Sequence, residues 1–229
     1  MSRIKQQQQQ ILLKEFELIS KNVLLQFAIL RKLIDEPQTE ELIEEAKNNE
    51  IIIDRLEIKI REEVAFTIFK FFPVAEELRR IIAYQDLTTN LERVGDMVLN
   101  VVRYVREVDL NRPELHKVRD TVVKMLDDVN LLIRNAILSF TNEQIQVAYE
   151  VIEGDDKVDE GYHYIKDLMS EMYSYRELTP EEVYELISIE CIAHNLERCG
   201  DSATNIAEST IYLIKGRDIR HGEDLNKKQ

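Results

Sequence analysis

Apolar residues recur at helical spacing through most of the chain, and short breaks rich in proline, glycine and threonine separate the stretches. One stripe with this spacing is Leu87, Leu91, Val94, Val98, Val101 and Val105. A second stripe is Ile189, Ile192, Leu196, Cys199, Ala203 and Ile206. No segment alternates with the two-residue period of a half-buried strand, so the pattern predicts an all-α protein.

The breaks divide the chain into six predicted helices of about 30 residues each. Pro37 and Pro73 end the first two helices, and Gly216 ends the sixth. The strings Thr141–Gln144 and Thr179–Glu182 have the form of capping boxes, which begin the fifth and sixth helices. The expected helices cover residues 3–36, 39–72, 74–108, 113–140, 141–175 and 179–216.

The connections between these helices are short, and short connections make sequential helices antiparallel neighbours. The pattern therefore predicts two tandem three-helix bundles, at 1–110 and 111–216, followed by a polar tail at 217–229.

An internal repeat supports this division into halves. The string Asn-Leu-Glu-Arg-Val-Gly-Asp at 90–96 returns 105 residues later as Asn-Leu-Glu-Arg-Cys-Gly-Asp at 195–201, with six of seven positions identical. In each copy Glu and Asp lie four residues apart, on one side of the predicted helix and away from its apolar stripe.

The preceding helices carry further acidic pairs at the same offset, and helices packed about 8–10 Å apart would bring the pairs together. The first predicted set is Glu50, Asp54, Glu92 and Asp96, and the second is Asp155, Asp159, Glu197 and Asp201. A solvated acidic face is the alternative interpretation of both sets.

Carboxylates gathered in this way repel, since two unit charges 4 Å apart cost roughly 4 kcal/mol at an effective dielectric constant near 20. Such a set must protonate, stay apart or bind cations, and oxygen ligands alone suit Mg, Ca, Mn or ferric iron. Arg93 and Arg198 either pair with the acids or are exposed partners along the helix. Gly95 and Gly200 suggest a close approach of backbone to a neighbouring helix or to the site.

The net charge of −14 argues against a nucleic-acid partner and against adhesion to anionic lipid. No apolar run reaches transmembrane length, and the Gln-rich start lacks a signal-peptide core, so we expect a cytoplasmic protein without direct membrane insertion. Cys191 and Cys199 are too far apart on one helix to form a disulfide, and Cys199 is expected in the core.

The two Glu-Arg-x-Gly-Asp motifs, together with residues 73–83 and 151–159, resemble the PhoU family of phosphate-signalling proteins over essentially the whole chain. The resemblance implies a negative regulator rather than an enzyme, a homodimer that couples the ATPase of a phosphate ABC importer to a sensor histidine kinase. It also implies metal on the eight carboxylates of the two sets, and from the oxygen ligands we expect this metal to be iron, manganese or magnesium. Ser202 stands where many members of the family carry His.

Two other functions remain open from the residues. The acidic faces of a metal-free helical adaptor could dock basic partner surfaces directly. A carboxylate-bridged metalloenzyme would use paired Glu-x-x-His strings, but only Glu160–His163 has that form. The aromatic cluster Phe66, Phe69, Phe71 and Phe72 belongs in the core unless it is exposed, in which case it marks a dimer or partner surface.

Overall fold

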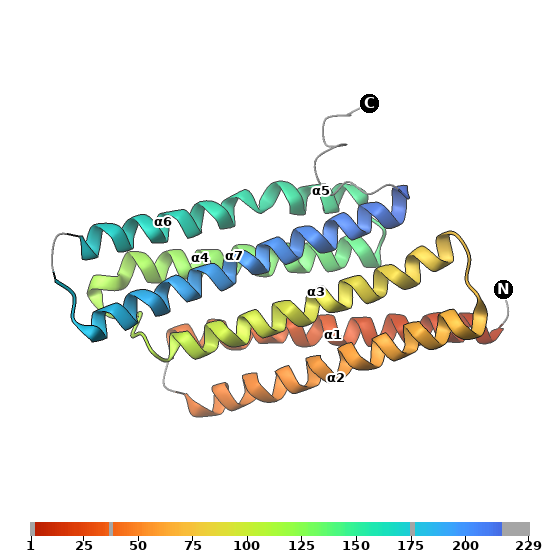
Figure 1. The fold of residues 1–229 in the computed structure, drawn as a ribbon, viewed down its shortest axis with the longest axis horizontal. Helices are drawn as coiled ribbons and strands as arrows, with labels where there is room; N and C mark the ends of the chain where they lie inside the picture. Colours follow the sequence, from red (N-terminus) through yellow and green to blue (C-terminus); the bar gives the residue numbers. More distant parts are fainter. Residues whose placement is uncertain (1–2, 37–38, 175–176, 217–229) are drawn as a thin grey trace.

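A computed structural model describes residues 3–36, 39–174 and 177–216, with side chains from residue 10 onward. The polar tail predicted at 217–229 lies outside these residues. The chain forms α1 (Arg3–Asp35), α2 (Glu40–Phe71), α3 (Glu76–Val105), a 3-10 turn (Pro113–Leu115), α4 (His116–Thr141), α5 (Ile145–Gly154), α6 (Asp156–Tyr173) and α7 (Pro180–Lys215) (Figure 1). The described residues contain no strand, so the all-α prediction is confirmed.

The last helix, α7, begins and ends at the two residues predicted from the sequence, Thr179 and Gly216. The Thr179 hydroxyl accepts from the Glu182 backbone N–H, and the Glu182 side chain accepts from the Thr179 N–H, which completes the predicted capping box. Gly216 ends α7 in the left-handed conformation, with φ of 67°, and its N–H donates to the Tyr212 carbonyl.

The predicted capping box at Thr141 is wrong. Thr141 is the last residue of α4, and its hydroxyl donates back to the Ile137 carbonyl. The chain reverses at Glu143, which has φ of 52°, and α5 then begins after Gln144 without a side-chain cap. A capping box requires its Ser or Thr to be the residue directly before the helix, but Thr141 belongs to α4 and Gln144 occupies that position for α5.

The fifth predicted helix is present, but it is interrupted at Asp155. This residue keeps helical angles, φ −66° and ψ −32°, so α6 continues in the direction of α5 (Figure 1). The third helix is shorter than expected, because α3 ends at Val105 and not near residue 108.

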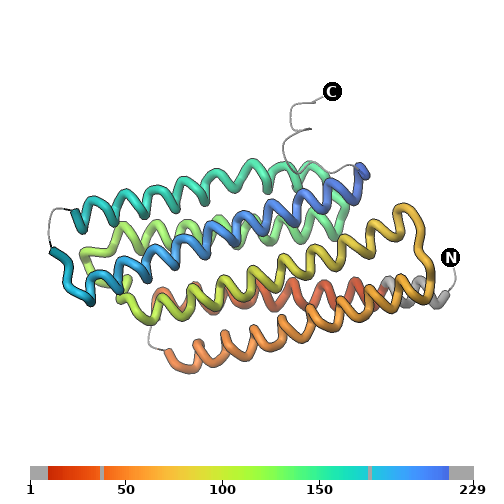
Figure 2. Tube along the Cα trace, in the orientation of Figure 1, coloured from red at the N-terminus to blue at the C-terminus, as the bar shows by residue number. Residues whose placement is uncertain are grey.

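The two helical units lie side by side along their length, with α1, α2 and α3 in one and α4 to α7 in the other (Figures 1 and 2). The two motif helices, α3 and α7, share the most extensive contact of any two elements. Their apolar stripes are buried, and one continuous core extends through both units. The tandem repeat therefore folds as two three-helix bundles joined through their motif helices.

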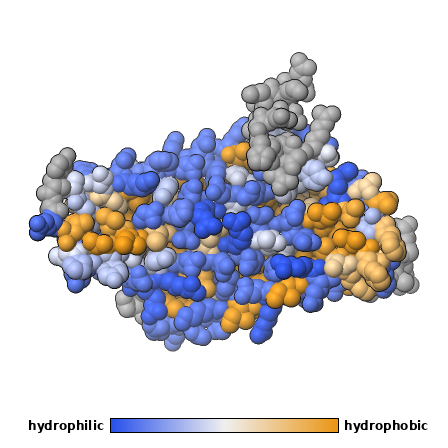
Figure 3. All heavy atoms as spheres, in the orientation of Figure 1, coloured by the Kyte–Doolittle hydropathy of each residue, from blue (hydrophilic) through white to orange (hydrophobic). Residues whose placement is uncertain are grey.

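The face of the molecule shown in Figure 3 is largely hydrophilic along its middle, with apolar patches toward its ends. At the connection between α2 and α3, Phe69 and Phe72 are each 78% exposed, and Val74 is 71% exposed. We call Phe66, Phe69, Phe72 and Val74 the phenylalanine tip. No helix among the described residues is long and apolar enough to cross a membrane.

Candidate functional site

The first carboxylate set lies where α2 packs against α3. Glu50 is only 6% exposed, whereas Asp54 and Asp96 are exposed at the same junction and Glu92 is half-buried. The helices come close because Gly95 has no side chain. A β-carbon there would lie 3.0 Å from Glu50 Oε2 and 3.0 Å from Ile53 Cδ1.

The electrostatics of this set favour the protonated form of Glu50. Burial, and after it the charges of the neighbouring Asp96 and Asp54 carboxylates, raise the pKa of Glu50 to about 8. Neither oxygen of Glu50 accepts a hydrogen bond from a donor among the described residues. A hydrogen bond between the Glu50 and Asp96 carboxyl groups requires one of the two to be protonated. Burial and the charge of Asp96 also raise the pKa of Asp54 and of Glu92.

The second set repeats this arrangement at the junction of α5, α6 and α7. Asp155 lies against Gly200, and a β-carbon on Gly200 would overlap Asp155 Oδ1. Burial, then the charges of Asp159 and Asp201, raise the pKa of Asp155 to about 7. The pKa values of Glu197 and Asp201 are raised by burial and by the neighbouring acids.

Both sets have cationic neighbours: Arg61 lowers the pKa of Glu92 in the first set, and His194, Arg93 and Arg198 lie beside the second. His194 Nδ1 lies 3.5 Å from Glu197 Oε2, and a positive charge on His194 lowers the pKa of Glu197 and of Asp201. His194 is not among the site residues predicted from the sequence, although its position one helical turn before Glu197 is a usable signal. Arg93 comes from the first repeat, yet together with Arg198 it lowers the pKa of Asp201.

The donor chemistry of both sets fits a hard cation. Each set offers four carboxylates, and several of their buried oxygens have no hydrogen-bond partner in the described part of the chain: both oxygens of Glu50, Oδ1 of Asp155 and Oε2 of Glu197. However, no three Asp, Glu, His or Cys side chains within residues 10–36, 39–174 and 177–216 are placed so that they could enclose an ion. Binding a metal therefore requires these carboxylates to rotate toward one another.

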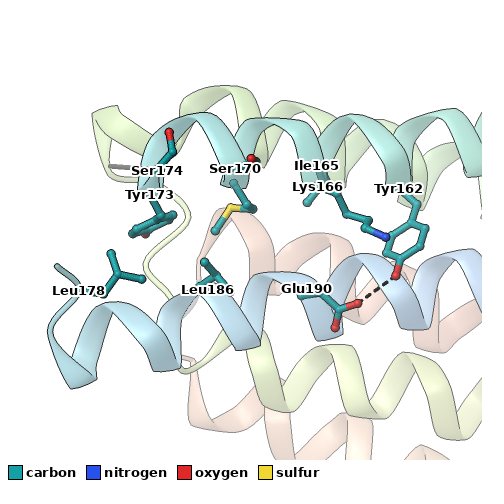
Figure 4. Close-up of a pocket in the computed structure, with 10 residues that line it drawn as sticks. Tyr162, Ile165, Lys166, Ser170, Tyr173, Ser174, Leu178, Leu186 and Glu190 are labelled. Atoms are coloured by element: carbon teal, nitrogen blue, oxygen red, sulfur yellow. Dashed lines mark hydrogen bonds between the residues drawn. The ribbon is translucent and has the colours of Figure 1, made fainter. Parts of the chain in front are cut away.

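A separate cavity of about 410 Å³ lies between α6 and α7 (Figure 4). Its walls include the apolar side chains Ile165, Met169 and Leu186, and the Tyr162 hydroxyl donates to Glu190 at 2.9 Å across one side of it. None of the eight carboxylates lines this cavity, so it is not part of either set.

Comparison with known proteins identifies the repeat. The model of the PhoU domain matches residues 16–105 and 122–210, which together include both motifs and the carboxylate pairs that precede them.

Curated relatives match over most of their length. A phosphate-specific transport system accessory protein PhoU homolog of Clostridium acetobutylicum is 31% identical over 192 residues, which cover 83% of this chain and 84% of the relative. A homolog of the same name in Aquifex aeolicus is 29% identical over 216 residues, which cover 92% of this chain and 96% of the relative.

Solved structures share the fold. The crystal structure of PhoU from Pseudomonas aeruginosa superposes with a TM-score of 0.78 at 24% identity, covering 93% of this chain and 99% of that one. The phosphate transport system regulatory protein PhoU from Streptococcus pneumoniae superposes with a TM-score of 0.74 at 21% identity, covering 91% and 96%. Because the domain model matches both halves and the relatives align along nearly the whole sequence, this chain belongs to the PhoU family.

Proposed function

We propose that this protein is a cytoplasmic accessory regulator of a phosphate-specific transport system. In this role it restrains uptake and the starvation response, acting between the importer ATPase and a sensor histidine kinase. The observation that carries the proposal is the PhoU domain match in both repeats, together with relatives named as accessory proteins of phosphate transport. A regulator is favoured over an enzyme because the carboxylate sets lack an adjacent nucleophile with a base.

We propose further that each carboxylate set holds metal: iron, manganese or magnesium. The ligands would be Glu50, Asp54, Glu92 and Asp96 in the first set, and Asp155, Asp159, Glu197 and Asp201 in the second. The orphaned buried oxygens support this assignment, since an ion would satisfy them and offset the repulsion among the carboxylates. A bound ion would also tie α2 to α3, and the α5–α6 junction to α7.

Elemental analysis of the purified protein, combined with thermal unfolding, tests the metal assignment. We expect wild-type protein to carry stoichiometric metal and to unfold at a higher temperature with metal than after chelation. Asp201→Ala should lose metal from the second set and the part of the stabilisation that this set contributes. Asp127→Ala removes one exposed carboxylate of α4, outside both sets, and should change neither quantity.

A metal-free adaptor is the second candidate. The net charge of −14 and the separation of the carboxylates in the described residues favour it. In an adaptor, Asp201→Ala should raise the unfolding temperature by relieving repulsion, and added iron, manganese or magnesium should have no effect. That combination of results would replace the metal sites with acidic docking surfaces and leave the regulatory proposal standing.

The regulatory role is tested in cells that lack the chain. We expect phosphate-starvation genes to be expressed in phosphate-rich medium, and the wild-type chain to repress them again. Purified importer ATPase and the cytoplasmic part of the kinase should each bind the chain. Continued repression without the chain, or failure to bind both proteins, would reject the proposed role.

The phenylalanine tip is the proposed surface for a homodimer or a partner. Phe69 and Phe72 expose large apolar area at one end of the α2–α3 hairpin, where the hydrophobic effect favours covering it.

A further inference from the structure

A polar pocket of about 310 Å³ lies where α3 meets α7, beside the second carboxylate set. Arg93 reaches it from the first repeat, and Arg198 and four other residues of α7 complete its wall. These four are Asp201, Ser202, Thr204 and Asn205. The pocket therefore brings together the arginines of the two copies of the repeated motif.

The repeat shows that this polarity is specific to one half. The positions in α3 that correspond to Ser202 and Thr204 are Met97 and Leu99, which are buried apolar residues. The second repeat thus has two small hydroxyl side chains where the first repeat has large apolar ones. This difference leaves a polar pocket between α3 and α7.

The two guanidinium groups are available to a ligand. Among the described residues, neither Arg93 nor Arg198 has a hydrogen-bond acceptor or an ion-pair partner within 4.0 Å. The Ser202 hydroxyl already donates to the Arg198 carbonyl, and the Thr204 hydroxyl donates to the Asp201 carbonyl. The free donors of the pocket are consequently the two guanidinium groups, with the Asn205 amide beside them.

We propose that Arg93 and Arg198 bind a small tetrahedral oxyanion, such as inorganic phosphate, in this pocket. A guanidinium group presents two parallel N–H donors to two oxygens of an oxyanion, which is the geometry that arginine recognises best. The lining of the pocket holds two such groups and one carboxylate, Asp201, which is an unusual local balance in a protein of net charge −14. The site rests on this geometry, while the choice of phosphate as probe rests on the proposed regulatory function.

Isothermal titration of the full chain with inorganic phosphate tests the site, in chelator-treated protein at fixed ionic strength in chloride buffer. We expect one phosphate per chain, and at least about tenfold weaker binding for each of Arg93→Gln and Arg198→Gln. Arg103→Gln, also an exposed arginine of α3, is the matched control and should bind like wild type. Circular dichroism confirms that each variant retains its helices.

Three results would overturn the site: no phosphate binding by wild type, equal weakening by Arg103→Gln, or binding that needs added metal and ignores the arginines. Sulfate competing as well as phosphate would support a general oxyanion site. Failure here would leave the regulatory proposal intact, since gene repression in cells is measured independently.

Discussion

Glu50 Oε2 lies 3.0 Å from the position that a β-carbon on Gly95 would occupy, so the buried acid is seated against the glycine of the repeated motif. The same relationship joins Asp155 to Gly200 in the second repeat. Each glycine thus lets one helix pass close enough to place a carboxylate over the motif of the next. This pairing explains why the motif carries Gly between Arg and Asp, although Gly is a poor helix former.

Gly200→Ala should displace the carboxylate of Asp155. The added methyl group would overlap Asp155 Oδ1, and the short side chain can relieve the overlap only by turning toward solvent. The pKa of Asp155 should then fall from about 7 toward its ordinary value of 3.8, because burial is its largest cause. Carboxyl chemical shifts measured across a pH titration check this.

Gly161→Ala is the control for that substitution. It adds the same methyl group on α6, but against Met125 Cγ and not against a carboxylate. An unchanged Asp155 pKa in Gly200→Ala, or an equal fall in Gly161→Ala, would contradict the seating of Asp155 on Gly200.

The stability of the metal-free protein should decrease as the pH rises from about 4.5 to about 8. The pKa of Glu50 is about 8 in the folded state against an ordinary value of 4.5, so the folded state retains a proton that the unfolded chain releases. Glu50→Gln cannot ionise, and we expect it to raise the free energy of unfolding at pH 8 by roughly 2–4 kcal/mol, with little change near pH 4.

Urea denaturation at several pH values measures this effect. Glu45→Gln, on the exposed side of α2, serves as the control and should leave the pH profile unchanged. If Glu50→Gln destabilised the protein equally at pH 4 and pH 8, the buried carboxyl would contribute by packing and not by its charge.

Phe69→Ser should leave the free energy of unfolding within about 0.5 kcal/mol of wild type, because the ring is 78% exposed. If the phenylalanine tip forms the homodimer, analytical ultracentrifugation should show this variant as a monomer. Tyr184→Ser removes a comparable ring, 72% exposed on α7, and should not alter assembly. Dimers that survive Phe69→Ser would remove the tip as the self-association surface.

Thr179→Ala should destabilise the protein by about 1 kcal/mol, because it removes the hydroxyl that accepts from the Glu182 N–H. Thr39→Ala should lower the free energy of unfolding by only a few tenths of that amount, since the Thr39 side chain makes no cap hydrogen bond to α2. Chemical denaturation of both variants gives the comparison. Equal losses would show that the capping box contributes no more than an uncapped threonine.

Apolar periodicity and the 105-residue repeat were enough to predict six helices in two similar units, because a buried helical stripe must recur with the period of the helix. The Thr179 capping box and the helix end at Gly216 could also be predicted, because both act through hydrogen bonds within a few residues. The role of Thr141 could not be predicted, because the chain reversal at Glu143 depends on how far α4 packs along its neighbours.

The sequence could predict only that the helices bring Glu50 near Asp96 and Asp155 near Asp201. It could not predict that Glu50 and Asp155 are more buried than their partners. Burial depends on the approach of a second helix, which no local pattern records. The meeting of Arg93 with Arg198 was likewise decided by tertiary structure, because the motif helices of the two repeats pack against each other. The sequence determined which side chains are repeated, and the packing of α3 on α7 determined which of them share a site.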